Sequence, residues 1–169
     1  MGVSPVISKY TSETSINVFM SSEDAMSRMA ALCSISEHCE SEIREKLQKA
    51  AIAESDIQRI IDALYEGDYL NTARYCRAFS RDKLRFSHWG RIKIQQALRM
   101  KGLSDADVRK ALSDLDEELH DEYRHVLTEV LGQKARSIHD EDDYTRRGKL
   151  IRFALGRGFT MDEILRELA

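Results

Sequence analysis

Residues 95–112 read QQALRMKGLSDADVRKAL, and residues 151–168 read IRFALGRGFTMDEILREL. Aligned without a gap, the two segments place Gly102 opposite Gly158 and, two residues later, Ser104 opposite Thr160. The apolar pairs that coincide are Leu103 with Phe159, Val108 with Ile164 and Leu112 with Leu168. Glycine commonly ends a helix, and Ser or Thr commonly begins one. Each segment therefore predicts a helix, a Gly turn and a second helix that begins at the Ser or Thr.

A weaker copy of this pattern lies 51 residues before the first of these segments. Ala51 and Ala53 stand there at the Gly and cap positions, so this turn is expected to be less sharply specified. The apolar positions that it shares are Ile43, Leu47, Ile52, Ile57 and Ile61. In the other two copies, Asp107 and Glu163 follow the cap at the spacing of a capping box.

Another helical stretch precedes each copy, at residues 24–34, 71–84 and about 115–137. The sequence therefore predicts an all-α fold of three tandem three-helix repeats, stacked into an elongated, modular array. The expected divisions are a flexible, Ser/Thr-rich N-terminal arm at 1–22 and helical units at 23–69, 70–113 and 114–169. The alternative is three independent amphipathic hairpins that look alike because all such hairpins do.

The composition supports the all-α class and excludes several others. The chain of 169 residues has one Pro, and Leu plus Ala outnumber Val plus Thr by 31 to 12. No apolar stretch has the length of a transmembrane helix, and the N-terminus lacks the apolar core of a secretory signal. The three cysteines, Cys33, Cys39 and Cys76, are an odd number, which favours reduced thiols and a cytoplasmic protein.

Charge is distributed unevenly along the chain. Residues 74–101 carry nine cations and one acid, residues 103–143 carry 13 acids and five cations, and residues 144–157 carry five cations and no acid. A basic middle unit is a plausible surface for phosphates or for an acidic partner. Two alternatives stay open: the cations solvate a helix face, or the basic and acidic units satisfy each other. Trp89, among these cations, is interpreted as a core residue rather than as a stacking platform for a nucleobase.

The chain shows little that indicates catalysis, a metal or a cofactor. Its eight glycines form no phosphate-binding loop. Cys33 and Cys39, with His38, lack the paired spacing of a zinc site. The acidic run at 140–143 is typical of a helix N-terminus, where carboxylates offset the helix dipole. The sequence therefore predicts a protein without enzymatic activity, a metal site or a cofactor.

Residues 63–112 resemble the central block of the RecX family, which regulates the bacterial RecA recombinase. The positions that carry the resemblance are Leu64, Gly67, Tyr69, Leu70, Ala73, Arg74, Tyr75, Phe79, Gly90, Arg91, Ile94, Leu98, Lys101, Gly102 and Leu103. The resemblance extends over roughly residues 28–168. Asn71 and Thr72 replace an acidic pair that is usual in the family, and Asn71 can still cap a helix. Gly67 tolerates the left-handed conformation and is expected to end the preceding helix. Asp68, which follows it, falls inside the Gly-Tyr turn and is interpreted as a neutral insertion.

The resemblance implies a regulator that binds RecA and its single-stranded-DNA filament and inhibits ATPase, strand-exchange and coprotease activities. We expect a monomer in the cytoplasm, with weak direct DNA binding as a further possibility. The hypothetical contact set comprises Arg77, Arg81, Arg85, Arg91, Lys93 and Lys101, together with Arg74, whose family-matched position is equally compatible with a structural role. The alternatives are a helical DNA-binding module that acts independently of RecA and a general helical-repeat scaffold.

Overall fold

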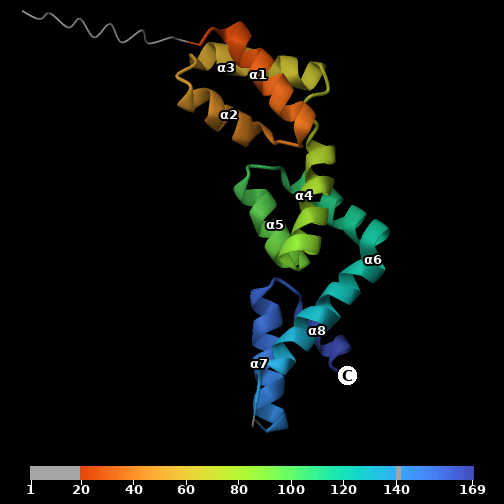
Figure 1. Ribbon diagram of the computed structural model, residues 1–169. Coiled ribbons are helices and arrows are strands. Elements are labelled where there is room, and N and C mark those ends of the chain that lie inside the picture. The colour runs from red at the N-terminus through yellow and green to blue at the C-terminus, as the bar shows by residue number, and fades with distance from the viewer. Residues whose placement is uncertain (1–19, 140–141) are drawn as a thin grey trace, which may run out of the picture.

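The computed structural model describes residues 20–139 and 142–169, and this part of the chain is all helical. Its helices are α1 (Ser22–Ile35), α2 (Glu40–Lys49), α3 (Glu54–Glu66), α4 (Thr72–Ser87), α5 (Arg91–Met100), α6 (Asp105–Arg136), α7 (Asp143–Gly156) and α8 (Met161–Glu167). Figure 1 shows them as an elongated array, with α1–α3 at one end and α7–α8 at the other. The expected all-α class is confirmed. The expected N-terminal arm lies almost entirely outside the described residues.

The turns follow the repeated sequence pattern. Gly102 and Gly158 adopt positive φ values of 81° and 93°, and Ala51 takes the same left-handed conformation in the first copy with φ 57°. Thr160 and Glu163 form the expected reciprocal capping box at the start of α8. The Oγ of Ser104 accepts from the backbone N–H of Asp107 and donates to its carboxylate, so this cap lacks the reciprocal bond.

The turn after α3 differs from the sequence expectation. Gly67 has an ordinary φ of −80°, and the left-handed residue is Asp68, with φ 56°. The Asp68 carboxylate accepts hydrogen bonds from Asn71 and from Arg74, at 3.2 and 3.0 Å. Asn71 caps α4 as expected, accepting from the backbone N–H of Arg74. The interpretation of Asp68 as a neutral insertion was therefore wrong, because this residue both makes the turn and anchors the start of α4.

The buried apolar side chains form two separate cores. The smaller core lies among α1, α2 and α3 and comprises Ala25, Cys33, Ile43, Leu47, Ile57, Ile60, Ile61, Leu64 and Leu70. The larger core runs continuously from α4 to α8 and includes Leu84, Ile94, Leu98, Val108, Leu127, Phe159 and Ile164. The apolar positions that match between the repeats are thus buried or packed on a core. The second and third units share one core, whereas the first keeps its own.

Helix α6 joins the second and third units without a loop. It runs through the expected division at 113/114, and its one residue with non-helical φ and ψ is Leu119 (φ −128°, ψ 23°). Its N-terminal half packs with α4 and α5, and its C-terminal half packs with α7 and α8 (Figure 1). The three sequence divisions stay predictions, and the helix kinks six residues beyond the last of them.

The turn between α7 and α8 docks directly against the turn between α4 and α5. The backbone N–H groups of Gly90 and Ile92 donate to the carbonyls of Arg157 and Gly158, at 2.8 and 3.0 Å. The Arg157 guanidinium donates to the Ser87 carbonyl at 3.0 Å. Hydrogen bonds to backbone carbonyls, in addition to the shared apolar core, therefore hold the third unit against the second.

Candidate partner-binding surface

The seven cations of the hypothetical contact set occupy two helices and one turn. Arg74, Arg77, Arg81 and Arg85 lie on α4, Arg91 and Lys93 on α5, and Lys101 directly after α5. Because residues four apart share a helix face, the last three α4 arginines form one row, and this row faces α6. The seven side chains do not form one continuous surface. They divide into an α4 row, a group at the junction with the first unit and a group at the junction with the third.

Acidic residues of α6 accompany the α4 row. Arg77 lies 3.7 Å from Asp114 and 3.6 Å from Glu118, and Arg81 lies 3.2 Å from Glu118. Arg85 donates two hydrogen bonds to Glu122, at 2.6 and 2.9 Å. The arginines of the basic middle unit are therefore largely paired with carboxylates of the acidic stretch that follows it. This pairing was one of the alternatives that the sequence left open.

These ion pairs remain close to water. The three arginine side chains are 38–45% exposed. The Arg85 hydrogen bond lowers the pKa of the Glu122 carboxyl and the Glu122 bond raises the pKa of Arg85, so both groups stay charged. Exposed ion pairs contribute little net stability, because solvent and salt screen them. The α4 arginines can therefore exchange an internal carboxylate for an external anion at small cost.

Arg74 and Lys101 lie where the second unit meets the first. Arg74 forms ion pairs with Glu37 and with Asp68. The Lys101 ammonium donates to Glu42 of α2, and this bond raises the pKa of Lys101. Tyr75 donates its hydroxyl to the same carboxylate at 3.1 Å. Both cations hold the first two units together.

Arg91 lies where the second unit meets the third. Its guanidinium donates two hydrogen bonds to Asp116 of α6 and one to Glu163 of α8, at 2.6–2.8 Å. It also stacks 5.1 Å from the centre of the Tyr123 ring. Burial alone would lower the pKa of Arg91, but the bond to Asp116 and the charge of Glu163 raise it above the ordinary range. This arginine is a structural junction of three helices.

Lys93 and Lys83 flank the indole of Trp89. Their ammonium nitrogens lie 4.9 and 4.8 Å from the indole ring. Trp89 is half-buried and packs on the larger core, as the sequence interpretation expected. Two ammonium groups at these distances are held by cation–π attraction and leave both charges available at the surface.

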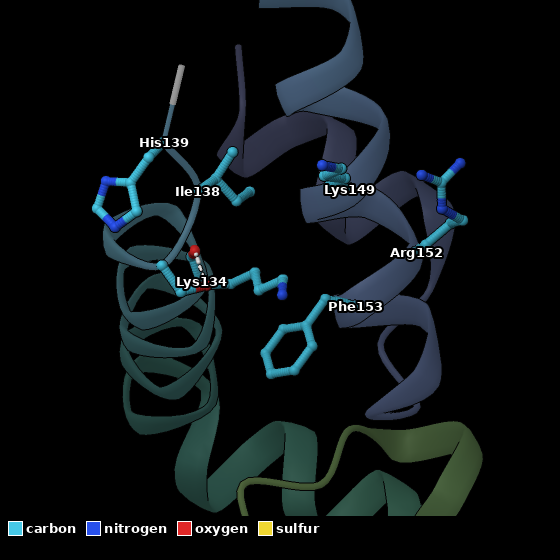
Figure 2. A pocket seen from close by; sticks show the side chains of 7 residues that line it. Lys134, Ile138, His139, Lys149, Arg152 and Phe153 are labelled. Atoms are coloured by element: carbon cyan, nitrogen blue, oxygen red, sulfur yellow. Dashed lines mark hydrogen bonds between the residues drawn. The ribbon is translucent and has the colours of Figure 1, made fainter. Parts of the chain in front are cut away.

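A further cationic region was not singled out from the sequence. Lys134 near the end of α6 lies across a groove from Lys149 and Arg152 of α7 (Figure 2). The acid-free stretch at 144–157 was visible in the sequence, but the contribution of Lys134 depends on how α6 and α7 pack. The run at 140–143 includes Asp142, which caps α7 by accepting from the backbone N–H of Thr145; residues 140 and 141 lie outside the described residues.

The described residues contain no group of acidic, His or Cys side chains that could hold a metal ion, and none of their helices has the length and apolarity to cross a membrane. Cys33, Cys39 and Cys76 are buried and unpaired, and burial raises the pKa of the Cys76 thiol to about 11. The cysteines therefore act as apolar core residues.

These features define an all-helical protein of tandem three-helix domains whose charged faces meet at the domain junctions. Two family models match it in chain order, the second three-helix domain of RecX over residues 71–112 and the third over residues 121–168. Together they cover more than half of the chain. The chain belongs to the RecX family of regulatory proteins.

Several curated proteins named regulatory protein RecX are similar to it. One from Clostridium botulinum is 33% identical over 125 residues, covering 74% of this chain and 58% of that protein. One from Clostridium perfringens is 34% identical over 127 residues, covering 73% and 57%. One from Prosthecochloris aestuarii is 29% identical over 148 residues, covering 83% and 93%. The matching region thus spans a little over half the length of the clostridial relatives.

Two solved structures share the fold. The crystal structure of a regulatory protein RecX matches with a TM-score of 0.76 and 20% identity, covering 87% of this chain and 71% of the other. That of RecX from Lactobacillus salivarius matches with a TM-score of 0.72 and 22% identity, covering 86% and 96%. The repeated helical architecture expected from the sequence is confirmed.

Proposed function

We propose that this protein binds a RecA recombinase and its single-stranded-DNA filament and inhibits the recombinase, so that it regulates DNA repair and recombination. Its role would be non-enzymatic and cytoplasmic, exerted as a monomer through contact alone. The buried, unpaired thiols are compatible with a reducing compartment.

The observation that carries the proposal is the ordered match of two RecX domains on an elongated helical array. Stacked helical repeats present long surfaces, which suit an extended partner better than a small ligand. A nucleoprotein filament is such a partner, since it repeats the same protein and phosphate surface along its length. The expected activity follows from the family, and the shape of the array supports it.

The test is a titration of single-strand-DNA-dependent ATP hydrolysis by the cognate RecA at fixed salt. Inhibition far below one molecule per recombinase would support capping or disassembly of filaments. Inhibition near equimolar ratio would support occupation along the filament. A folded sample with no effect at any ratio would contradict the proposal and favour a DNA-binding module that acts without RecA.

We further propose the α4 row of Arg77, Arg81 and Arg85 as the main contact with anionic groups of the filament. Lys93, beside Trp89, would extend this contact along α5. Arg74, Arg91 and Lys101 would act indirectly, by holding the three units in register. An anionic partner must compete with the α6 carboxylates, and it gains a charge-complementary contact that guides docking.

A charge exchange separates a contact role from an internal one. Arg85→Glu alone breaks the ion pair with Glu122. The double variant, Arg85→Glu with Glu122→Arg, restores an ion pair in which the two charges have changed places. If Arg85 contacts the filament, both variants should need about tenfold more protein for half-inhibition, as expected for a lost contact worth about 1.4 kcal/mol. Full recovery in the double variant would mean that Arg85 acts only within the fold.

A further inference from the structure

The third hairpin of the array, formed by α7 and α8, carries apolar side chains at four positions where the other two hairpins carry polar ones. We name these four residues the α7–α8 patch: Ile151, Leu155, Met161 and Leu165. In the gap-free repeat alignment, their counterparts in the second unit are Gln95, Arg99, Asp105 and Arg109. Those in the first unit are Arg44, Gln48, Glu54 and Gln58. The third unit thus departs from a polar pattern that the first two units share.

The three hairpins have the same turn, so positions that align in the sequence occupy equivalent places in space. Their left-handed residues are Ala51, Gly102 and Gly158. In each turn, the backbone N–H of this residue donates to the carbonyl three residues earlier, at 2.9 Å. The following residue donates to the carbonyl five residues before it, at 3.1–3.4 Å. Contacts in one hairpin therefore show which positions are neighbours in the others.

Side chains at these positions touch across the hairpin in the first two units. The Arg44 guanidinium donates to the side-chain oxygens of Glu54 and Gln58, at 2.6 and 2.7 Å. In the second unit, the Arg99 guanidinium donates to the Asp105 carboxylate at 3.0 Å. The four apolar residues at the same positions of the third unit therefore form one continuous patch.

The α7–α8 patch faces solvent. Leu155, Met161 and Leu165 are 40, 44 and 39% exposed. Ile151 packs partly on the larger core. Ile92 of α5, also exposed, lies next to the turn between α7 and α8, because its backbone N–H is bonded to a carbonyl of that turn. Single exposed apolar residues are common on proteins, but a continuous group of them is typical of a contact surface.

Charged residues of α8 flank the patch in a self-complementary order. Asp162 follows Met161, and Arg166 follows Leu165. Both charged side chains are exposed, and neither forms an ion pair within the part of the chain that the structure describes. Because they are four residues apart, they lie on the same side of the helix. When two such helices pack antiparallel about a two-fold axis, the Asp162 of each molecule faces the Arg166 of the other.

We propose that the α7–α8 patch binds the same patch of a second molecule of this protein about a two-fold axis. A contact of this kind requires a surface that is complementary to itself. The patch meets this requirement, since Met161 of one molecule packs on Leu165 of the other while the charges beside them pair across the axis. Because α7 and α8 lie at one end of the array, the pair joins two arrays at their third units (Figure 1).

The size of the patch makes this pairing weak. Stable interfaces bury about 800 Å² on each partner. The patch, in contrast, consists of four side chains that are at most 44% exposed. The monomer therefore predominates in dilute solution, in agreement with the monomeric role proposed above, and the pair forms as the protein concentration rises. Pairing requires no recombinase, so it is independent of the proposed function.

Sedimentation equilibrium of the full chain, from low micromolar to millimolar concentration, measures the pairing. The weight-average mass of the wild type should rise from the monomer value of 19.4 kDa towards twice that value and no further. Leu155→Arg with Met161→Asp and Leu165→Arg gives the third unit the side chains that the second unit carries at these positions, so the fold should tolerate it. This triple variant should stay monomeric at every concentration, with an unchanged circular dichroism spectrum. Met100→Gln is the control, since it removes an exposed apolar side chain outside the patch, and it should pair like the wild type.

Charge exchange on α8 distinguishes two-fold pairing from unspecific apolar association. Asp162→Arg places like charges opposite each other, and so does Arg166→Asp, so each change should weaken pairing by about tenfold. An equimolar mixture of these two variants should pair as well as the wild type, because each variant then faces the opposite charge. A wild type that stays at 19.4 kDa, association that continues beyond the dimer, or a triple variant that pairs normally would overturn the proposal. So would a mixture that pairs no better than either variant alone.

Discussion

Gly90 and Gly158 meet backbone to backbone at the junction of the second and third units. A Cβ on Gly90 would lie 2.4 Å from the carbonyl carbon of Gly158 and from the backbone nitrogen of Phe159. A Cβ on Gly158 would lie 2.5 Å from the Cβ of Lys93, and its φ of +93° also disfavours any side chain. No flexible side chain is available to yield, so the contact requires two glycines.

Gly90→Ala should destabilise the protein by about 1–3 kcal/mol, the usual cost of forcing atoms into a packed region. Urea denaturation followed by circular dichroism measures the change. Gly132→Ala on α6 is the matched control, because a Cβ there meets only the Arg136 guanidinium, at 3.8 Å. That change should stabilise the helix by up to about 1 kcal/mol. Equal stability of the two variants would contradict the close-approach argument.

The conformation of one of these two glycines could be predicted from the sequence. Gly158 follows a periodic helix and precedes a Thr cap, so its left-handed conformation was predictable from local signals. Gly90 has φ −80° and begins α5 without a side-chain cap, so its sequence neighbourhood contains no signal for its role. What constrains Gly90 is a turn some 70 residues away, and a single sequence does not record that contact.

Helix α6 shows how an element can belong to two units at once. The repeat pattern indicates a division near residue 113, but the chain has neither Gly nor Pro between residues 103 and 131 to end a helix there. The two helices therefore continue into each other, with the kink at Leu119 between two packing environments. The repeat could be predicted from its caps, whereas the fusion depends on the absence of a breaker and on packing at both ends.

Arg91 holds this long helix to its neighbours, since it binds Asp116 of α6 and Glu163 of α8 from the start of α5. Arg91→Lys should lower the free energy of unfolding by about 2 kcal/mol, because one ammonium cannot replace a bidentate guanidinium and the third bond together. Thermal denaturation at neutral pH measures the loss. Arg109→Lys, at an exposed α6 position, should have no measurable effect. A similar change in both variants would exclude a junction role for Arg91.

At the scale of the whole molecule, the positions of the basic and acidic stretches could be predicted from the sequence, but the ion pairs between them could not. The sequence locates the basic and acidic stretches, but a contact set chosen from them included Arg74, Arg91 and Lys101, which the fold uses at its junctions. The groove between α6 and α7 was missed, because its cations come from two helices. Pairing of charges depends on helix packing, and that packing is fixed by apolar residues elsewhere.

The first unit is joined to the rest mainly by polar groups around Glu42. Its carboxylate accepts from Lys101 and Tyr75, and it bonds the His38 ring nitrogen at 3.1 Å. Burial alone would raise the pKa of Glu42, but the hydrogen bonds from Lys101 and His38 hold it below its ordinary value. A carboxyl with a lowered folded-state pKa stabilises the fold above its unfolded-state pKa and loses that contribution as pH falls through the folded-state pKa.

Acidification should therefore loosen the first unit from the α4–α8 body while both apolar cores persist. Glu42→Gln should reproduce this at neutral pH, enlarging the radius of gyration in solution scattering and weakening the junction by about 1–2 kcal/mol. Glu45→Gln on the same helix is the control, since within residues 20–139 and 142–169 the ion pair of Glu45 is with Lys49 of α2 itself. Because other carboxylates also titrate, the decisive quantity is the difference between wild type and Glu42→Gln, which should shrink as the pH falls below the ordinary pKa of a Glu carboxyl and vanish once it is below the lowered pKa of Glu42. A difference that persists at low pH would show that the Glu42 charge does not hold the junction, leaving the small apolar contact through Cys39 to do so.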